Sequence, residues 1–348
     1  MELERRRFSK DSPRFLTYRC RDRWLPSHWR REGIRAACAE GFRVNEPLPI
    51  DEFLLDLVAR LRDQGLGCSI TGGLACVEYG LVEHTLDCDI IFDSQKVSKL
   101  LDFLTQTSFS DVDCQYRGNL SAPLDHRWMA NGWTAHLFWN LGPASAYLDV
   151  FCQAPRAKLP WWESGSPFAP RATVAGMKRT QRMKDWSQAT GLGLQLLRAG
   201  DQEGWLHIFD AEALLEALEH VALEPSLLST RPVLRLAQQR DPLLERAVQT
   251  EIDFWSKLDR LRLRAYQQAS KPYVKALRAS DLSPSLRQEH ERRVRVAEEL
   301  LPENPLDDVS KVALVRRAKE EVGLGLVPEL LSLLPQLGKN FEYRGGVE

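Results

Sequence analysis

The chain has 348 residues, of which 43% are hydrophobic and 27% are charged, and its formal net charge is −1. Because this length exceeds the usual size of a single domain, we expect two domains. The near-zero charge excludes a strong overall bias toward nucleic acid or membranes, and no apolar run approaches the ~20 residues that cross a bilayer.

Residues 1–50 are predicted to form an arm rich in arginine and aromatic residues, without the apolar core of a secretory signal. The arm could touch an anionic partner, or it could simply pack on the core as a solvated segment. Pro47 and Pro49 end it, because proline disfavours helix in the residue before it. Asp51 is then the predicted N-cap of an amphipathic helix over about residues 51–65.

The run from residue 70 to residue 92 is the most informative part of the chain. It predicts a strand end, a Gly72-Gly73 turn, a short helix and a second strand. Asp87 and Asp89 stand at i and i+2 on that second strand, so both side chains leave the same face. Neighbouring carboxylates repel unless a cation neutralises them, and Mg²⁺ is the usual partner beside substrate phosphates. Glycine lets backbone N–H groups approach an anion, so the run predicts phosphoryl or nucleotidyl transfer.

The remaining elements alternate first between helix and strand and then become helical. Residues 95–105 have helical spacing, and residues 133–139 and 146–152 flank a hairpin loop. Asp149 lies among apolar residues on the second of these strands. The proline-rich residues 154–170 are a predicted linker, and the spacing beyond them is helical. This order predicts a small unit of helices and strands followed by a helical domain.

The seven cysteines are odd in number, and no two are spaced as Cys-x-x-Cys. Structural zinc sites normally draw on closely spaced ligand pairs, so the pattern argues against one. Buried or idle thiols are typical of a reducing compartment, and we therefore expect a cytoplasmic protein.

These features resemble the nucleotidyltransferase superfamily, the fold shared by polymerase-β-like enzymes. Its signature is a Gly-Gly or Gly-Ser pair, then Asp-x-Asp on a strand, then a third carboxylate on a later strand. Gly72-Gly73, Asp87-Cys88-Asp89 and Asp149 match it. The resemblance implies an α+β fold: a small mixed-sheet nucleotidyltransferase catalytic domain over residues 51–155, followed by an all-helical C-terminal domain over residues 171–348.

Within that superfamily the chain looks most like the AbiEii-type toxin and nucleotidyltransferase-like branch. The matching positions are Thr71, Gly72, Gly73, Ala75, Gly80, Thr85, Asp87 and Asp89, and a later match comprises Lys178, Arg182, Lys184 and Asp185. Lys178 and Arg182 are expected one turn apart on one helix face. Glu83 departs from the branch, whose members often have arginine at that position.

The resemblance implies a metal-dependent transferase. Asp87 and Asp89 would hold a metal shared with the triphosphate, and Asp149 would complete a second metal site and help deprotonate the acceptor. Two Mg²⁺ ions are expected, with Mn²⁺ as the alternative. Thr71, Gly72 and Gly73 would grip the β- and γ-phosphates, and Lys178 and Arg182 would neutralise further phosphate charge.

The substrates are implied less narrowly. The donor would be an NTP such as ATP, and the acceptor a hydroxyl on RNA, for example tRNA, or on a protein; the toxin-like branch adds an antitoxin partner. The alternatives are a small-molecule acceptor, as in antibiotic-modifying relatives, and an inactive nucleotide-binding or regulatory relative, toward which Glu83 is the only hint.

Two further groups of residues have open interpretations. His126 and His136 lie near three tryptophans that could stack on a base or sugar or could pack in the core; these are Trp128, Trp133 and Trp139. The long C-terminal helix carries basic residues that could contact RNA phosphates, but interleaved acids such as Asp253 and Asp259 favour a mixed-charge face; the basic residues are Arg260, Arg262, Arg264 and Lys271.

Overall fold

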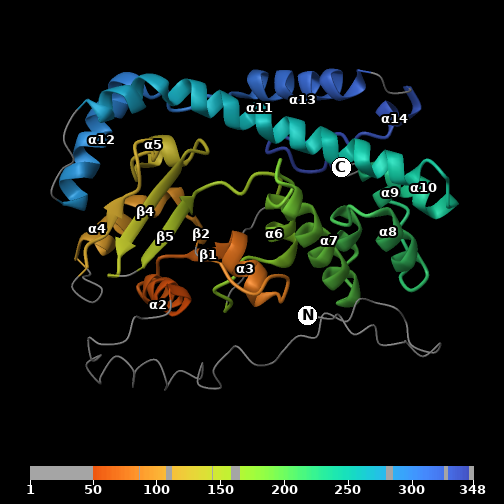
Figure 1. Ribbon diagram of the computed structural model, residues 1–348, viewed down its shortest axis with the longest axis horizontal. Coiled ribbons are helices and arrows are strands. Elements are labelled where there is room, and N and C mark those ends of the chain that lie inside the picture. Colours follow the sequence, from red (N-terminus) through yellow and green to blue (C-terminus); the bar gives the residue numbers. More distant parts are fainter. Residues whose placement is uncertain are drawn as a thin grey trace, which may run out of the picture. The chain divides into compact units, whose positions relative to one another are not determined.

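The computed structural model describes residues 50–85, 87–106, 112–142, 144–157, 165–279, 285–324 and 328–344 (Figure 1). The chain divides into two units, residues 1–44 and residues 45–348. All described residues belong to the second unit, so the arm predicted over residues 1–50 lies outside the described residues except at Ile50. Within the described part of the chain, no helix combines the length and apolarity that a membrane crossing requires.

A five-stranded mixed sheet forms the first half of the second unit. Its spatial order is β1-β2-β5-β4-β3, in which β2 and β5 run parallel and the other neighbouring strands run antiparallel. The strands are β1 (Cys68–Thr71), β2 (Asp87–Phe92), β3 (Gln115–Tyr116), β4 (Thr134–Asn140) and β5 (Ser145–Phe151). The parallel pair brings together two strands that are far apart in the sequence.

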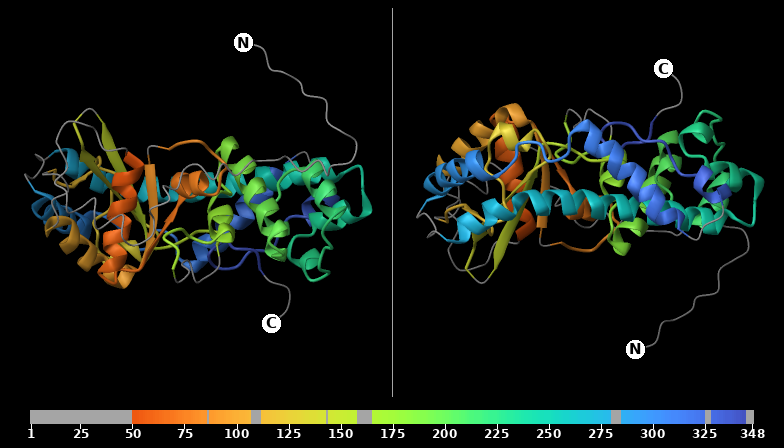
Figure 2. Two further views of the ribbon diagram at one scale, coloured as in Figure 1. Left: turned by 90° about the horizontal axis from the view of Figure 1, so that it is seen from below. Right: turned by 90° about the horizontal axis from the view of Figure 1, so that it is seen from above.

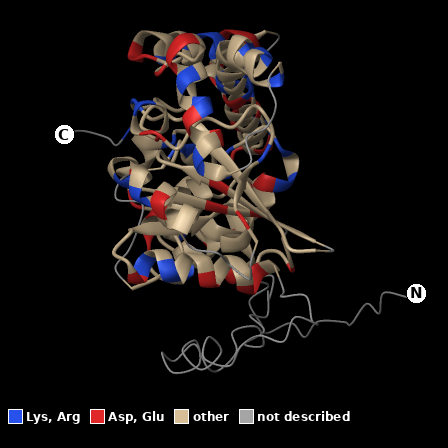
Figure 3. Cartoon of the chain, turned by 90° about the vertical axis from the view of Figure 1, so that its left-hand side faces the viewer, with Lys and Arg blue, Asp and Glu red and all other residues tan. Residues whose placement is uncertain are grey.

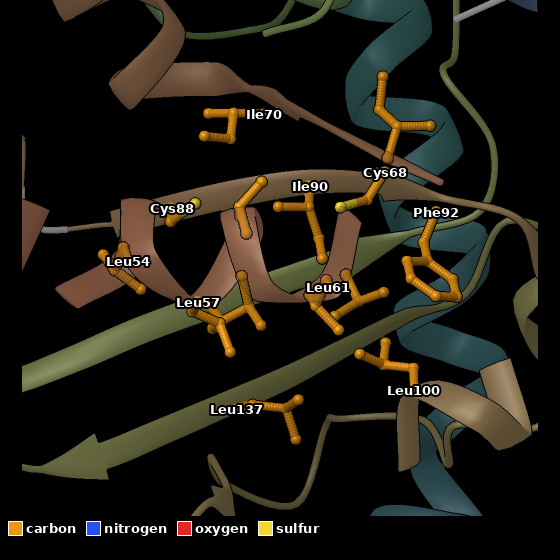
Figure 4. Packing of buried hydrophobic residues seen from close by; sticks show 14 of the residues in the cluster. Leu54, Leu57, Leu61, Cys68, Ile70, Cys88, Ile90, Phe92, Leu100 and Leu137 are labelled. Atoms are coloured by element: carbon orange, nitrogen blue, oxygen red, sulfur yellow. The ribbon is translucent and has the colours of Figure 1, made fainter. Parts of the chain in front are cut away.

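One face of this sheet is covered by apolar helix faces. The helix α2 (Ile50–Asp63) buries Leu54, Leu57 and Leu61 against strand residues such as Ile90 and Phe92 (Figure 4). The 3₁₀ turn η1 (Ser94–Lys96) leads into α4 (Val97–Gln106), which adds to the same core. Each fully buried leucine contributes about 1.5–3 kcal/mol of transfer free energy. Because strand side chains alternate, the residues between these core positions face the other side of the sheet.

Helices make up most of the remaining described chain. They are α3 (Gly72–Glu78), α5 (His126–Met129), α6 (Arg171–Met177), α7 (Met183–Arg198), η2 (Gln202–Leu206), α8 (Ala211–Leu218), α9 (Leu227–Thr230), α10 (Val233–Gln239), α11 (Leu244–Arg278), α12 (Leu286–Leu300), α13 (Asp308–Gly323) and α14 (Pro328–Ser332). The 35-residue α11 is the longest of them, and α13 lies alongside it (Figures 1 and 2). A second hydrophobic core is centred on buried residues such as Trp205, Phe254 and Trp255.

A third, smaller cluster joins the sheet region to the long helix. Trp128 and Trp133 pack there with Tyr273 and Leu277 of α11. The indole Nε1 of Trp128 donates to the Leu301 carbonyl at 3.0 Å, just beyond α12. Core packing therefore accounts for these two tryptophans.

The expected α+β class is confirmed, because a mixed sheet is followed by a helical region. The predicted hairpin is also present, with Asn140 opposite Ser145; its Pro143 lies outside the described residues. The prediction that Asp51 caps the first helix is wrong, because α2 already includes Ile50. The helix expected to carry Lys178 and Arg182 is in fact interrupted, since α6 ends at Met177 and α7 begins at Met183.

Candidate functional site

Asp87, Asp89 and Asp149 lie on the sheet face opposite the α2 core. The parallel register places Asp89 beside Asp149 and Asp87 beside Tyr147. All three aspartates line one cavity. The structure thus brings together the three acids singled out in the sequence, because β2 and β5 are neighbours in the sheet.

Arg117 pairs with two of these carboxylates. It follows β3, and its guanidinium lies 2.6 Å from Asp149 Oδ1 and 3.8 Å from Asp87 Oδ1. The same guanidinium lies over the Tyr147 ring, 4.9 Å from the ring centroid. Arg117 was not predicted as a site residue, because no motif surrounds it in the sequence. Its position depends on the β3–β4 pairing, in which the Arg117 N–H donates to the His136 carbonyl at 2.8 Å.

His136 is the second partner of Asp149. It stands opposite Asp149 on β4, with Nδ1 2.8 Å from Asp149 Oδ1. A carboxylate only accepts hydrogen bonds, so Nδ1 donates, and in the neutral ring Nε2 is unprotonated. Asp149 is therefore held by one arginine and one histidine donor, and His136 belongs to the cavity wall.

Asp89 is packed against the glycine turn. Gly72 has a φ of 66°, and a Cβ added there would lie 1.7 Å from Asp89 Oδ2. Glycine is thus required at position 72 for both its backbone conformation and its lack of a side chain. Burial, followed by the neighbouring Asp149 charge, raises the pKa of Asp89 to about 7. Ionising Asp89 is therefore costly in this setting, and a cation close to its carboxylate would reduce that cost.

The other two residues of the expected phosphate-gripping turn lie around it. Thr71 ends β1, is fully buried, and has its Oγ1 3.4 Å from the Met177 sulfur. Gly73 stands where a Cβ would come within 2.6 Å of Thr85 Oγ1. Thr71 and Gly72 both line the cavity beside the aspartates.

Lys178 and Arg182 converge on Asp185, although they do not share a helix. Lys178 Nζ is 3.4 Å from Asp185 Oδ1, and Arg182 Nε is 2.8 Å from Asp185 Oδ2. Thr180 Oγ1 donates to the same Oδ2 at 2.5 Å, which stabilises the turn between α6 and α7. Asp185 is fully buried and the Lys178 side chain is 7% exposed, whereas that of Arg182 is 58% exposed. One buried carboxylate therefore holds both cations at the cavity edge.

A cavity of about 470 Å³ separates the sheet face from the helical region. This volume lies in the range of small-molecule sites. Its sheet side carries the three aspartates and His136, and its helical side includes residues of α11, the start of α13 and the segment near residue 340. The residues on the helical side include Asp259, Arg262, Tyr266, Lys311 and Asn340.

The donor set fits a hard divalent cation. Carboxylate oxygens are the ligands that Mg²⁺ and Mn²⁺ prefer, and the raised pKa of Asp89 indicates that its charge is under-neutralised. Among the described residues, however, no group of three or more His, Cys, Asp or Glu side chains stands close enough to hold a metal ion. Asp149 instead faces Arg117 and His136, and Asp87 keeps 59% of its side chain exposed. Metal binding would therefore require these side chains to turn toward one another.

The remaining histidine and tryptophan candidates lie in three different places: the surface, the core and the cavity wall. His126 is exposed and contacts Gln95 and the Ser94 carbonyl. Trp139 is 1% exposed and packs on Phe53 with ring centroids 5.3 Å apart. Of the histidine–tryptophan group, His136 and Trp133 line the cavity, as judged over the described residues.

A comparison of the chain with models of known protein families gave no match. A comparison with curated proteins gave none either.

Proposed function

We propose that this protein is a Mg²⁺- or Mn²⁺-dependent nucleotidyltransferase similar to the AbiEii-type branch of the polymerase-β-like superfamily. It would move a nucleotide from an NTP such as ATP to a hydroxyl on RNA, for example tRNA, or on a protein. One observation carries the proposal. The carboxylates of Asp87, Asp89 and Asp149 share one sheet face beside the Gly72 turn, and Lys178 and Arg182 stand on the same cavity.

The acidic side chains would bind the cation, and the basic side chains would bind the phosphates. Asp87, Asp89 and Asp149 would hold the divalent cation, which neutralises triphosphate charge and acidifies the acceptor hydroxyl when bound. Lys178 and Arg182 would bind phosphate oxygens, and their common partner Asp185 would fix their positions. Thr71, Gly72 and Gly73 would face the β- and γ-phosphates.

The transfer step balances without a further reactant. The acceptor oxygen forms a bond to the α-phosphorus, and the bond from that phosphorus to the bridging oxygen breaks. The electron pair of the broken bond leaves with pyrophosphate. The acceptor's proton passes to solvent, and Asp149 accepts the hydrogen bond of the hydroxyl before transfer. Positioning and electrostatics supply most of the rate in such reactions.

A second candidate is a nucleotide-binding relative that does not transfer. The observation that favours it is the Arg117 guanidinium, which already neutralises Asp149 at 2.6 Å. Glu83, the sequence departure that pointed the same way, is exposed and lies outside the cavity lining of the described residues. The two candidates therefore differ in whether Arg117 yields its place when NTP and metal bind.

The test is a labelled-nucleotide transfer assay. The full chain is incubated with each α-³²P-labelled NTP, Mg²⁺ or Mn²⁺, and total tRNA, and label is followed on RNA and on the protein itself. Label that disappears in Asp87→Asn and Asp149→Asn but persists in Asp63→Asn supports the proposal; Asp63 is exposed and outside the cavity lining.

The other outcomes separate the alternatives. Absence of label together with an NTP-induced rise in melting temperature favours the nucleotide-binding relative. In a parallel reaction with added hydroxyl-bearing small molecules, label on such a compound but not on RNA or protein favours the antibiotic-type alternative. The proposal is overturned if no NTP gives label and no NTP gives a thermal shift.

A further inference from the structure

The helical side of the cavity is fixed by a buried ion pair. Arg156, 5% exposed, donates through Nη1 to Asp259 Oδ1 of α11 at 2.8 Å. The other oxygen, Asp259 Oδ2, accepts from the Gln181 N–H at 3.2 Å, in the turn between Lys178 and Arg182. The charge of Asp259 is therefore already neutralised by Arg156, and α11 is tied to the phosphate-side turn.

Arg262 presents a further positive charge on the same wall. It lies one turn after Asp259, but its only hydrogen bond to a described residue is a long one, 3.4 Å from Nη2 to Asp259 Oδ1. Its Nε–H is buried and has no hydrogen-bond partner within the described part of the chain. The side chain is 18% exposed and lines the cavity. A buried, unsatisfied guanidinium N–H costs free energy that an anionic ligand would recover.

Lys311 adds a second cation to this wall. It is near the start of α13, and its side chain is 26% exposed. Its Nζ lies 3.9 Å from Asp308 Oδ1. Asp308 is also paired with Lys339 at 3.2 Å, so it neutralises Lys311 only in part. Elsewhere charges of both signs are mixed along the described chain (Figure 3). The helical wall of the cavity therefore carries two cations, Arg262 and Lys311, whose contacts to acidic partners are long.

We infer that Arg262 and Lys311 form an anion subsite for the acceptor, and that the acceptor carries a phosphate group. The inference rests on the proposed function, because it takes the acceptor to enter the same cavity as the NTP. Lys178 and Arg182 stand at the cavity edge and serve the triphosphate. The helical wall is then left to bind a second anion, and guanidinium and ammonium groups are the usual partners of phosphate oxygens. Such an acceptor is a nucleotide or a nucleic acid strand, and an unmodified protein hydroxyl lacks this anion.

The four basic residues considered on the long helix differ in whether they line the cavity. Arg262 lines the cavity, whereas the other three lie outside its lining as far as the described residues show; these are Arg260, Arg264 and Lys271. The mixed-charge interpretation also fails for Asp259, which is 3% exposed and part of the internal ion pair.

The experiment measures binding rather than transfer. Fluorescence anisotropy with a short 5′-labelled single-stranded oligoribonucleotide gives its affinity for the full chain, and unlabelled mononucleotide is used as competitor. We expect Arg262→Gln to weaken oligonucleotide binding about tenfold and to lower the salt dependence by about one phosphate contact. Arg262→Lys should retain most of the affinity. The matched control is Arg246→Gln, an exposed arginine on the same helix and away from the cavity, which should change affinity less than twofold.

The result is independent of whether transfer occurs. The NTP-induced thermal shift should survive in Arg262→Gln and be lost in Lys178→Gln. If unlabelled mononucleotide displaces the labelled oligonucleotide as well as unlabelled oligonucleotide does, the subsite belongs to a small phosphorylated acceptor. If mononucleotide competes more weakly, the subsite belongs to a nucleic acid strand. The inference is overturned if wild-type protein binds neither, if Arg246→Gln loses as much affinity as Arg262→Gln, or if Arg262→Gln loses NTP binding instead.

Discussion

Replacing Asp89 by asparagine should stabilise the metal-free protein at neutral pH. Burial and the Asp149 charge raise the pKa of Asp89 from 3.8 to about 7. Between these values the folded protein binds more protons at this site than the unfolded chain does, so the free energy of unfolding falls as the pH rises from about 4 to about 7. Asparagine keeps the shape of the side chain beside Gly72 and removes the charge.

The size of the effect follows from the same values. A rise of this size in the pKa corresponds to at most about 4 kcal/mol, at about 1.36 kcal/mol for each pH unit. Asp89 keeps partial contact with solvent in the cavity, which reduces the cost of its charge. We therefore expect about 1–2 kcal/mol of stabilisation at pH 7.5 and little difference at pH 4.

Urea unfolding from pH 4 to pH 8 in EDTA measures this difference directly. The wild-type and variant curves should diverge as the pH rises, and added Mn²⁺ should stabilise the wild type more than the variant. Asp63→Asn is the matched control, because Asp63 is exposed at the end of α2. A variant that is less stable than the wild type at pH 7.5 without metal would refute the assignment of Asp89 as an under-neutralised buried carboxylate.

Three further predictions follow from the described contacts. Gly72→Ala should destabilise the protein by about 2–4 kcal/mol in urea unfolding, because the new Cβ meets Asp89 at positive φ; unchanged stability would contradict the close contact. Arg117→Gln should raise Mn²⁺ affinity severalfold by calorimetry, since it frees Asp149, whereas weaker binding would mean that the arginine positions the carboxylates for metal. Burial lowers the pKa of His290 from 6.5 to about 4, so wild-type stability should be lost as the pH falls through that window. His290→Asn can still accept a hydrogen bond from the Tyr116 hydroxyl. It should reduce the loss of unfolding free energy as the pH falls, and an unaltered pH dependence would contradict this role of His290.

Local patterns in the sequence predicted the sheet face well. Alternation placed Asp87 and Asp89 on one side of β2, and the apolar neighbours of Asp149 predicted β5. The hairpin was predictable because its loop and both flanking strands are contiguous. Strand order was less accessible, since the β2–β5 pairing that aligns Asp89 with Asp149 depends on contacts distant in sequence.

The partners of these residues were not predictable from local spacing. Arg117 lies 32 residues from its partner Asp149, and Arg156 lies 103 residues from Asp259. The break between α6 and α7 was hidden for another reason. The residues there have helical spacing, but Thr180 and Lys178 bond the Asp185 side chain and stabilise a turn instead. Tertiary bonding thus overrode the local helical pattern.

The length of α11 has a consequence for how the protein melts. At ~1.5 Å per residue its 35 residues extend about 52 Å, and they contribute Phe254 and Trp255 to one hydrophobic core and Tyr273 and Leu277 to another. If either core loses its packing, α11 loses part of the contacts that stabilise it, and the other core is destabilised as well. Calorimetry of the intact chain should therefore record one cooperative transition, with the sheet and the helices unfolding in a single event.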